Sequence, residues 1–69
     1  MSMQLFERIV RTKFPHELIK FWHENGRHFA KLRGGVRLST NSNCRRILVE
    51  NGSHYCHHYH WDPAAEGLC

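Results

Sequence analysis

The sequence predicts an α+β fold, in which two N-terminal helices precede a small antiparallel β-sheet built from one or two hairpins. Three observations lead to this prediction. Apolar residues recur at helical spacing over the first 25 residues, and Gly-Gly and Asn-Gly pairs later separate short runs suited to strands. The length of 69 residues leaves room for one small domain, 1–69, with a thin core.

The first helix is predicted over residues 3–14. Its apolar residues follow the i, i+3, i+4 spacing of one helical face, and they are Leu5, Phe6, Ile9, Val10 and Phe14. Ser2 is a suitable N-cap, and Glu7 with Arg11 forms a favourable i, i+4 pair.

The second helix is predicted from about Pro15 to Asn25, because proline suits the first turn of a helix. Its apolar side would consist of Leu18, Ile19, Phe21 and Trp22. Gly26 would then be the left-handed residue that ends the helix. A single helix kinked at Pro15 is the alternative.

The segment after Gly26 permits two interpretations. In the preferred one, Phe29, Ala30 and Leu32 belong to a strand that turns at Gly34-Gly35 and returns over residues 36–40. In the other, residues 27–33 form a third short helix. The polar run 39–43 is predicted to be a loop, and residues 62–69 are predicted to be an irregular, partly mobile tail.

A second hairpin is predicted over Cys44 to Trp61, turning at Asn51-Gly52. A two-residue turn would place Glu50 opposite Ser53 and Val49 opposite His54. One face would then carry Leu48, Tyr55, Tyr59 and Trp61 with Cys44, Arg46 and His57, and the other Ile47, Val49 and Cys56 with Arg45, His54, His58 and His60. The aromatic face is expected to be the buried one.

Positive charge is concentrated in the middle of the chain. Residues 27–49 contain six Lys or Arg and no acid, within a formal net charge of +4. Such a cluster favours an anionic partner, so we predict a basic, non-enzymatic binding module that docks on nucleic acid or on an acidic protein surface, as in an inhibitor or regulator of a nucleic-acid-handling enzyme. A solvated surface without a partner is the simpler alternative. The predicted binding residues are Arg27, Lys31, Arg33, Arg37, Arg45 and Arg46, with Tyr55, Tyr59 and Trp61 to stack on bases.

The surroundings of the protein are predicted from its cysteines and its hydropathy. Three cysteines allow only one internal disulfide, and no secretory signal pattern is present, so a cytoplasmic location is expected. No apolar run reaches the length of a membrane span. Because so small a core is only marginally stable, a homodimer is a further expectation.

Histidines and thiols gather in the strand after Gly52, which raises the alternative of a small zinc-binding domain. Its candidate ligands are His54, Cys56, His58 and His60. Residues two apart on one strand face lie about 6.8 Å apart, so at most an adjacent pair would share one ion. The main prediction is therefore that the protein has no metal cofactor.

The run Gly52-Ser53-His54, together with Glu17-Leu18-Ile19-Lys20 in a segment ending at Asn25-Gly26, resembles HicA-type toxins, which are small RNases. The resemblance implies a helix over Glu17 to Gly26 and a catalytic role for His54 as general acid or base on RNA. Arg45 or Arg46 would hold the phosphate. This chain inserts most of the basic segment between the two motifs.

Overall fold

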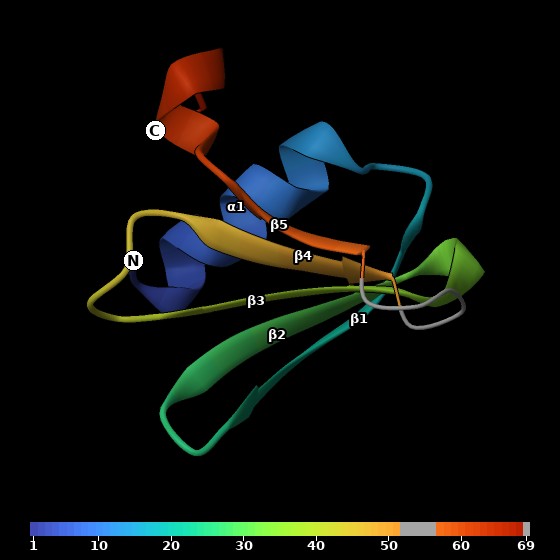
Figure 1. The fold of residues 1–69 in the computed structure, drawn as a ribbon, viewed down its shortest axis with the longest axis horizontal. Coiled ribbons are helices and arrows are strands. Elements are labelled where there is room, and N and C mark those ends of the chain that lie inside the picture. Colours follow the sequence, from blue (N-terminus) through green and yellow to red (C-terminus); the bar gives the residue numbers. More distant parts are fainter. Residues whose placement is uncertain (52–56, 69) are drawn as a thin grey trace.

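The computed structural model describes residues 1–51 and 57–68 and contains one α-helix and a five-stranded antiparallel sheet (Figure 1). The strands are neighbours in chain order, so the sheet is a simple meander. The predicted α+β class is confirmed, but the second helix is not. The elements are α1 (Met3–Lys13), β1 (Leu18–Glu24), β2 (Arg27–Leu32), η1 (Arg33–Gly35), β3 (Val36–Asn41), β4 (Ile47–Asn51), β5 (His57–Trp61) and η2 (Pro63–Glu66).

The first helix, α1, is confirmed with its predicted cap. The Ser2 hydroxyl oxygen accepts a hydrogen bond from the Leu5 N–H at 3.1 Å, and Glu7 pairs with Arg11 at 3.2 Å. Phe6, Ile9 and Val10 are buried against the sheet. Burial of such side chains contributes about 1.5–3 kcal/mol each, so this one helical face anchors the fold.

The predicted second helix is wrong, because residues 18–24 form strand β1. Asn25 and Gly26 have φ values of 50° and 75°, and Glu24 pairs directly with Arg27. These are the features of a two-residue type I′ hairpin turn, for which Asn-Gly is the preferred dipeptide. Gly26 therefore has the predicted left-handed backbone, but it lies in the turn after strand β1 and not at the end of a helix. The helix that the likeness to HicA-type toxins implies over residues 17–26 is also absent.

The strand interpretation of residues 27–33 is confirmed, and the short-helix alternative is wrong. Strands β2 and β3 pair through Ala30 and Leu38 and are joined at Gly34 and Gly35, whose φ values are 81° and 79°. The predicted loop 39–43 begins too early, because β3 continues to Asn41 and buries Thr40. The Thr40 hydroxyl donates to the Arg46 carbonyl at 2.9 Å, which satisfies this buried polar group.

The predicted register of the β4–β5 hairpin is also wrong. Glu50 pairs with His58 instead of Ser53, and Val49 pairs with Tyr59 instead of His54. Each partner thus lies five residues further along the chain (58 − 53 = 59 − 54 = 5), and an odd shift exchanges the two faces of a strand. Residues 52–56, which include Gly52 of the predicted turn and the predicted partners Ser53 and His54, lie outside the described part of the chain.

The exchange of faces changes which β4 side chains are buried. Ile47 and Val49 are buried and pair with Trp61 and Tyr59, whereas Leu48 pairs with His60 on the other face. Trp61 packs against the core, but Tyr59 remains 61% exposed. The expectation that Leu48 is buried together with the aromatic residues is therefore wrong, since Ile47 and Val49 share their face and supply the core.

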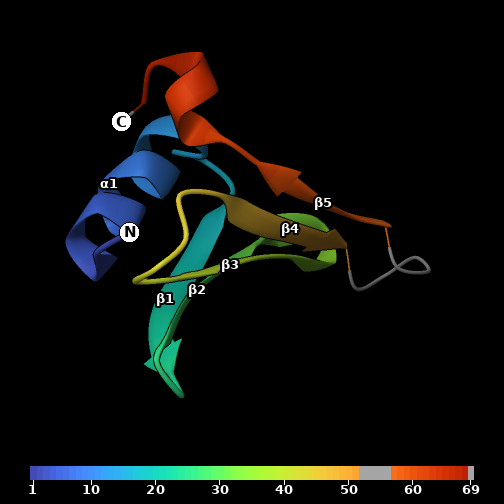
Figure 2. The ribbon, with the colours of Figure 1, turned by 60° about the vertical axis from the view of Figure 1, so that its left-hand side comes forward.

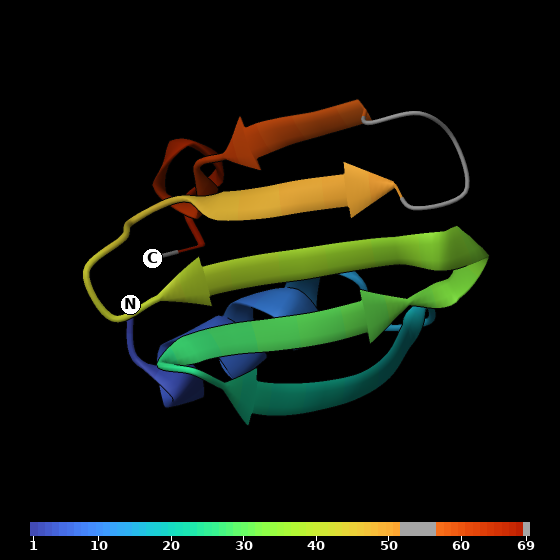
Figure 3. The same cartoon turned by 60° about the horizontal axis from the view of Figure 1, so that its bottom comes forward.

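Helix α1 lies on one side of the sheet only (Figures 2 and 3). The core between them contains Phe6, Ile9, Val10, Ala30, Leu32, Leu38, Ile47 and Val49. The Met1 nitrogen also donates to the carbonyls of Asn41, Ser42 and Cys44 at 2.9–3.2 Å, which ties the start of α1 to the β3–β4 loop. In Figure 3 the sheet is seen from the opposite side, with the helix behind it and no described helix in front.

Within the predicted tail, 62–69, residues Pro63–Glu66 form the short 3₁₀ helix η2. Pro63 is buried at the start of η2, and the Leu68 N–H donates to the Pro63 carbonyl at 3.0 Å. Glu66 joins this turn to the rest of the fold, because its two carboxylate oxygens accept from the Lys13 ammonium at 2.7 Å and from the Trp61 indole N–H at 2.8 Å. No helix among the described residues is long and apolar enough to cross a membrane.

Replacing Gly26 by Ala is expected to lower the free energy of unfolding by about 1 kcal/mol, because alanine is strained in the left-handed region. No atom lies within 4 Å of the added Cβ at this φ of 75°, so the cost is backbone strain and not a clash. Urea unfolding measures it. Gly26→Asn is the matched control and should lose less, since asparagine tolerates this conformation. Equal losses in both variants would contradict the turn assignment.

Glu66 is expected to stabilise the fold above pH 4.5 and to lose that effect in acid. The hydrogen bond from Lys13 is the main cause that lowers the pKa of Glu66 below its usual 4.5, so the folded state favours the carboxylate. Glu66→Gln should therefore lower the thermal midpoint near neutral pH, and the difference from the unaltered protein should shrink as the pH falls below 4.5. Glu17→Gln is the control, because Glu17 forms no ion pair with a described residue. A difference that grows in acid would contradict this account.

Candidate functional site

The face of the sheet opposite α1 carries a cluster of aromatic and cationic side chains, here called the open face. Strand alternation places it there, because Ala30, Leu32 and Leu38 point into the core and their neighbours point the other way. The cross-strand pairs of this face include Trp22 with Phe29 and Lys31 with Arg37. On strands β1 to β3 the open face consists of Lys20, Trp22, Glu24, Arg27, Phe29, Lys31, Arg37, Ser39 and Asn41.

Two aromatic rings form the centre of the open face. The Trp22 and Phe29 rings are stacked, with centroids 5.1 Å apart and planes only 8° from parallel. Strand pairing fixes this contact, since Trp22 and Phe29 are direct cross-strand partners on the two sides of the Asn25-Gly26 turn. The type I′ turn thus sets the register that brings the rings together.

Cations lie over the remaining ring faces. The Lys20 ammonium is 5.2 Å from the Trp22 ring centroid, and the guanidinium carbons of Arg37 and Arg27 are 5.7 and 6.0 Å from that of Phe29. The two rings and these three cations thus form one continuous column across strands β1 to β3. Each cation–π contact at an exposed site contributes about 0.5–1 kcal/mol, so a stronger ligand of the rings can displace the cation.

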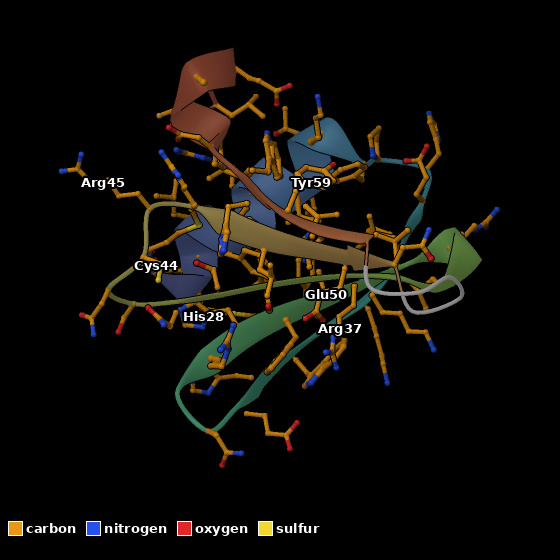
Figure 4. The ribbon with its side chains drawn as sticks, viewed as in Figure 1. His28, Arg37, Cys44, Arg45, Glu50 and Tyr59 are labelled. Carbon is orange, nitrogen blue, oxygen red and sulfur yellow. The ribbon has the colours of Figure 1, made fainter. Side chains whose placement is uncertain are left out.

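The charges of the open face do not balance. Lys20 and Lys31 are direct cross-strand partners, and Lys31 also faces Arg37. Like charges in these positions repel one another. Glu50 on β4 offsets Arg37, accepting from its Nε at 2.9 Å and from a terminal nitrogen as well. In Figure 4 these two side chains lie side by side.

With Glu24 and Glu50 as its acids, the open face carries four cations and two carboxylates, a net charge of +2 (4 − 2). A groove of about 660 Å³ lies beside the ring column. Both charge signs and one ring border it, and its lining residues are Lys20, Trp22, Lys31, Gly35, Val36, Arg37 and Glu50. A ligand in this groove would contact a ring and three cations at once.

The structure separates the predicted binding residues into groups. Arg27, Lys31 and Arg37 meet on the open face. Arg33 lies in η1, and Arg45 and Arg46 lie in the exposed β3–β4 loop, with Arg45 directed away from Arg37 in Figure 4. Of the predicted aromatic residues, the two that the structure describes, Tyr59 and Trp61, do not join these cations.

Tyr59 and Trp61 belong to the helix side of the sheet. Tyr59 borders a pocket of about 400 Å³ with Phe14 and Val49, and the Trp61 ring packs edge-on against Phe14 at 5.8 Å. Tyr55 lies outside the described residues. Sequence reasoning missed the aromatic residues of the open face, Trp22 and Phe29, because it placed Trp22 in a helix. The Asn25-Gly26 dipeptide, which is preferred in a type I′ hairpin turn, is the signal that would have found them.

Among the described residues, the structure does not bring together the side chains predicted for a zinc site or for catalysis. His54 and Cys56 lie outside the described residues, and His58 and His60 are two residues apart on β5. Within the described part of the chain, no group of three or more His, Cys, Asp or Glu residues lies together. Cys44 is a free, exposed thiol.

Comparisons with protein-family models, with curated proteins and with solved structures give no match for this chain.

Proposed function

We propose that this protein binds single-stranded nucleic acid across the open face of its sheet. The observation that carries this proposal is the stacked pair Trp22 and Phe29, set among the cations Lys20, Arg27, Lys31 and Arg37 on a face that no described helix covers. Nucleic acid offers both partners that such a face requires, phosphates for the cations and flat bases for the rings.

The charge of the open face supports phosphate binding. Only Arg37 among its four cations pairs with a carboxylate of the described residues. Phosphates that replace water and mobile counter-ions around Lys20, Arg27 and Lys31 relieve their mutual repulsion and release counter-ions from the nucleic acid. The affinity should therefore fall steeply with added salt.

The two aromatic rings favour single-stranded nucleic acid, and not a duplex, as the ligand. In a duplex the base faces are covered by stacking, whereas a single strand exposes them to aromatic side chains. A base on the outer face of Trp22 would displace the Lys20 ammonium. Base stacking contributes about 1–3 kcal/mol against about 0.5–1 for an exposed cation–π contact, so the exchange is favourable. The released ammonium can then pair with a phosphate of the bound strand.

An acidic protein surface is the competing partner, because arginine binds carboxylates as well as phosphates. The two partner classes differ in their use of the rings. Carboxylates on a protein need the cations only, whereas bases need Trp22.

Trp22→Ala is expected to weaken binding of a fluorescently labelled, unstructured oligonucleotide about tenfold or more, in line with the loss of one stacked base. Fluorescence anisotropy measures the Kd. Trp22→Phe keeps an aromatic ring and should recover most of the affinity. Tyr59→Ala, which removes an exposed ring from the helix side, should leave the Kd unchanged. Equal effects of Trp22→Ala and Tyr59→Ala, with both variants folded by circular dichroism, would reject the open face as the binding surface.

The logarithm of the binding constant is expected to fall with the logarithm of salt concentration with a slope of about −2 to −3, as three or four phosphate contacts to a single strand require. Arg27→Gln should reduce that slope by about 0.7, the share of one contact. Arg8→Gln removes the same charge from the exposed side of α1 and should leave the slope unchanged. Absence of oligonucleotide binding at low salt would overturn the proposal and favour an acidic protein partner.

A further inference from the structure

Two histidines face each other on the helix side of the β1–β2 hairpin, one residue away from the stacked rings of the open face. His23 and His28 are direct cross-strand partners, and their ring centroids are 5.1 Å apart with planes inclined by 33°. His23 is exposed, whereas His28 is only 6% exposed and also contacts the Phe6 ring. Figure 4 shows His28 on β2, beside the start of the helix.

The hydrogen bonding of His28 determines which of its ring nitrogens carries the proton. Its Nε2 lies 3.0 Å from the Met1 carbonyl oxygen. Since a carbonyl oxygen only accepts, Nε2 is the protonated nitrogen of the neutral ring and Nδ1 has a free lone pair. Nδ1 is buried and has no hydrogen-bond partner among the described residues. A buried polar atom of this kind costs stability unless a ligand or a donor reaches it.

We propose that His23 and His28 form a binding site for a divalent transition-metal ion, held by Nδ1 of His28 and one ring nitrogen of His23, with water in the remaining positions. Imidazole is a preferred ligand of Zn²⁺, Ni²⁺ and Cu²⁺. The proposal is independent of nucleic-acid binding, because it concerns the opposite face of the sheet.

The spacing of the two rings fits a shared ion. A metal–nitrogen bond of about 2.0–2.1 Å places the ion roughly 3.2 Å from each ring centroid. At a tetrahedral angle the two centroids would then be about 5.2 Å apart. The observed separation is 5.1 Å. His23 is exposed, so its ring is the one that would turn toward the ion.

The hydrogen bond to Met1 would orient the buried ligand. Metal-bound histidines typically donate their second ring N–H to a carbonyl or carboxylate, which fixes the tautomer and the ring plane. His28 has this arrangement in the structure. With two protein ligands in place of the four of a closed structural zinc site, the ion should be weakly held and exchangeable.

The proposal is tested by recording the ¹⁵N signals of the histidine rings by NMR while Zn²⁺ is added to the full chain. Before addition, the Nδ1 of His28 should have the signal of an unprotonated nitrogen. On addition this signal should move to the metal-bound range, while Nε2 of His28 keeps its proton. A His28 Nδ1 that is protonated at the start, or one that does not respond to Zn²⁺, would overturn the proposal.

Matched single-histidine variants separate this site from the histidines of β5. His23→Ala removes an exposed ring and should abolish the response of His28, whereas His60→Ala, also exposed, should leave it intact. The same pattern among the variants is expected in thermal unfolding with Ni²⁺. Binding of Ni²⁺ should lower the unfolding equilibrium constant about 100-fold when the free Ni²⁺ concentration is a hundred times its Kd. A His28 response or a thermal shift that persists in His23→Ala would overturn the two-histidine site.

Discussion

Packing of α1 against one face of the sheet is the constraint on which the rest of this structure depends. The helix buries Phe6, Ile9 and Val10 against apolar residues of β2, β3 and β4. Because side chains alternate along a strand, this single contact assigns every second residue of those strands to the core and its neighbours to the opposite face. The open face exists because the described residues form a single α-helix for a sheet with two sides.

Alternation also explains how two different chemistries arise next to each other in the β1–β2 hairpin. Trp22 pairs with Phe29, and the next residues inward to the turn, His23 and His28, pair on the other side. The rings of the open face are surrounded by cations and suit a large, flat, anionic ligand. On the helix side, His28 is enclosed by Phe6 and Met1, and with the exposed His23 it suits a small cation. Both pairs depend on the same turn at Asn25-Gly26, so a change of register there would remove both sites together.

The amount of structure predicted from the sequence differs between elements for a physical reason. Helix α1 is recognised with its cap and its buried face, because its signals lie within one turn of one another in the chain. The β2–β3 strands are recognised because two glycines separate them. Residues 18–24 contain Leu, Ile, Phe and Trp without a clear period, and the choice between helix and strand depends on pairing with β2. The site prediction inherits this error, because it includes Arg27, Lys31 and Arg37 of the open face but omits the two central rings of that face.

The local features of this protein are therefore properties of its sequence: the capped N-terminal helix, the glycine turns, the α+β class and the basic middle segment. Which aromatic residues accompany that charge, the register of β4 with β5, and the contact between His23 and His28 are decided only in the folded protein. These features depend on contacts between residues distant in the chain, and a strand shifted by an odd number of positions presents the opposite set of side chains. The burial of Ile47 and Val49 under α1 selects one of the two sets, and no local signal in the strand itself can do so.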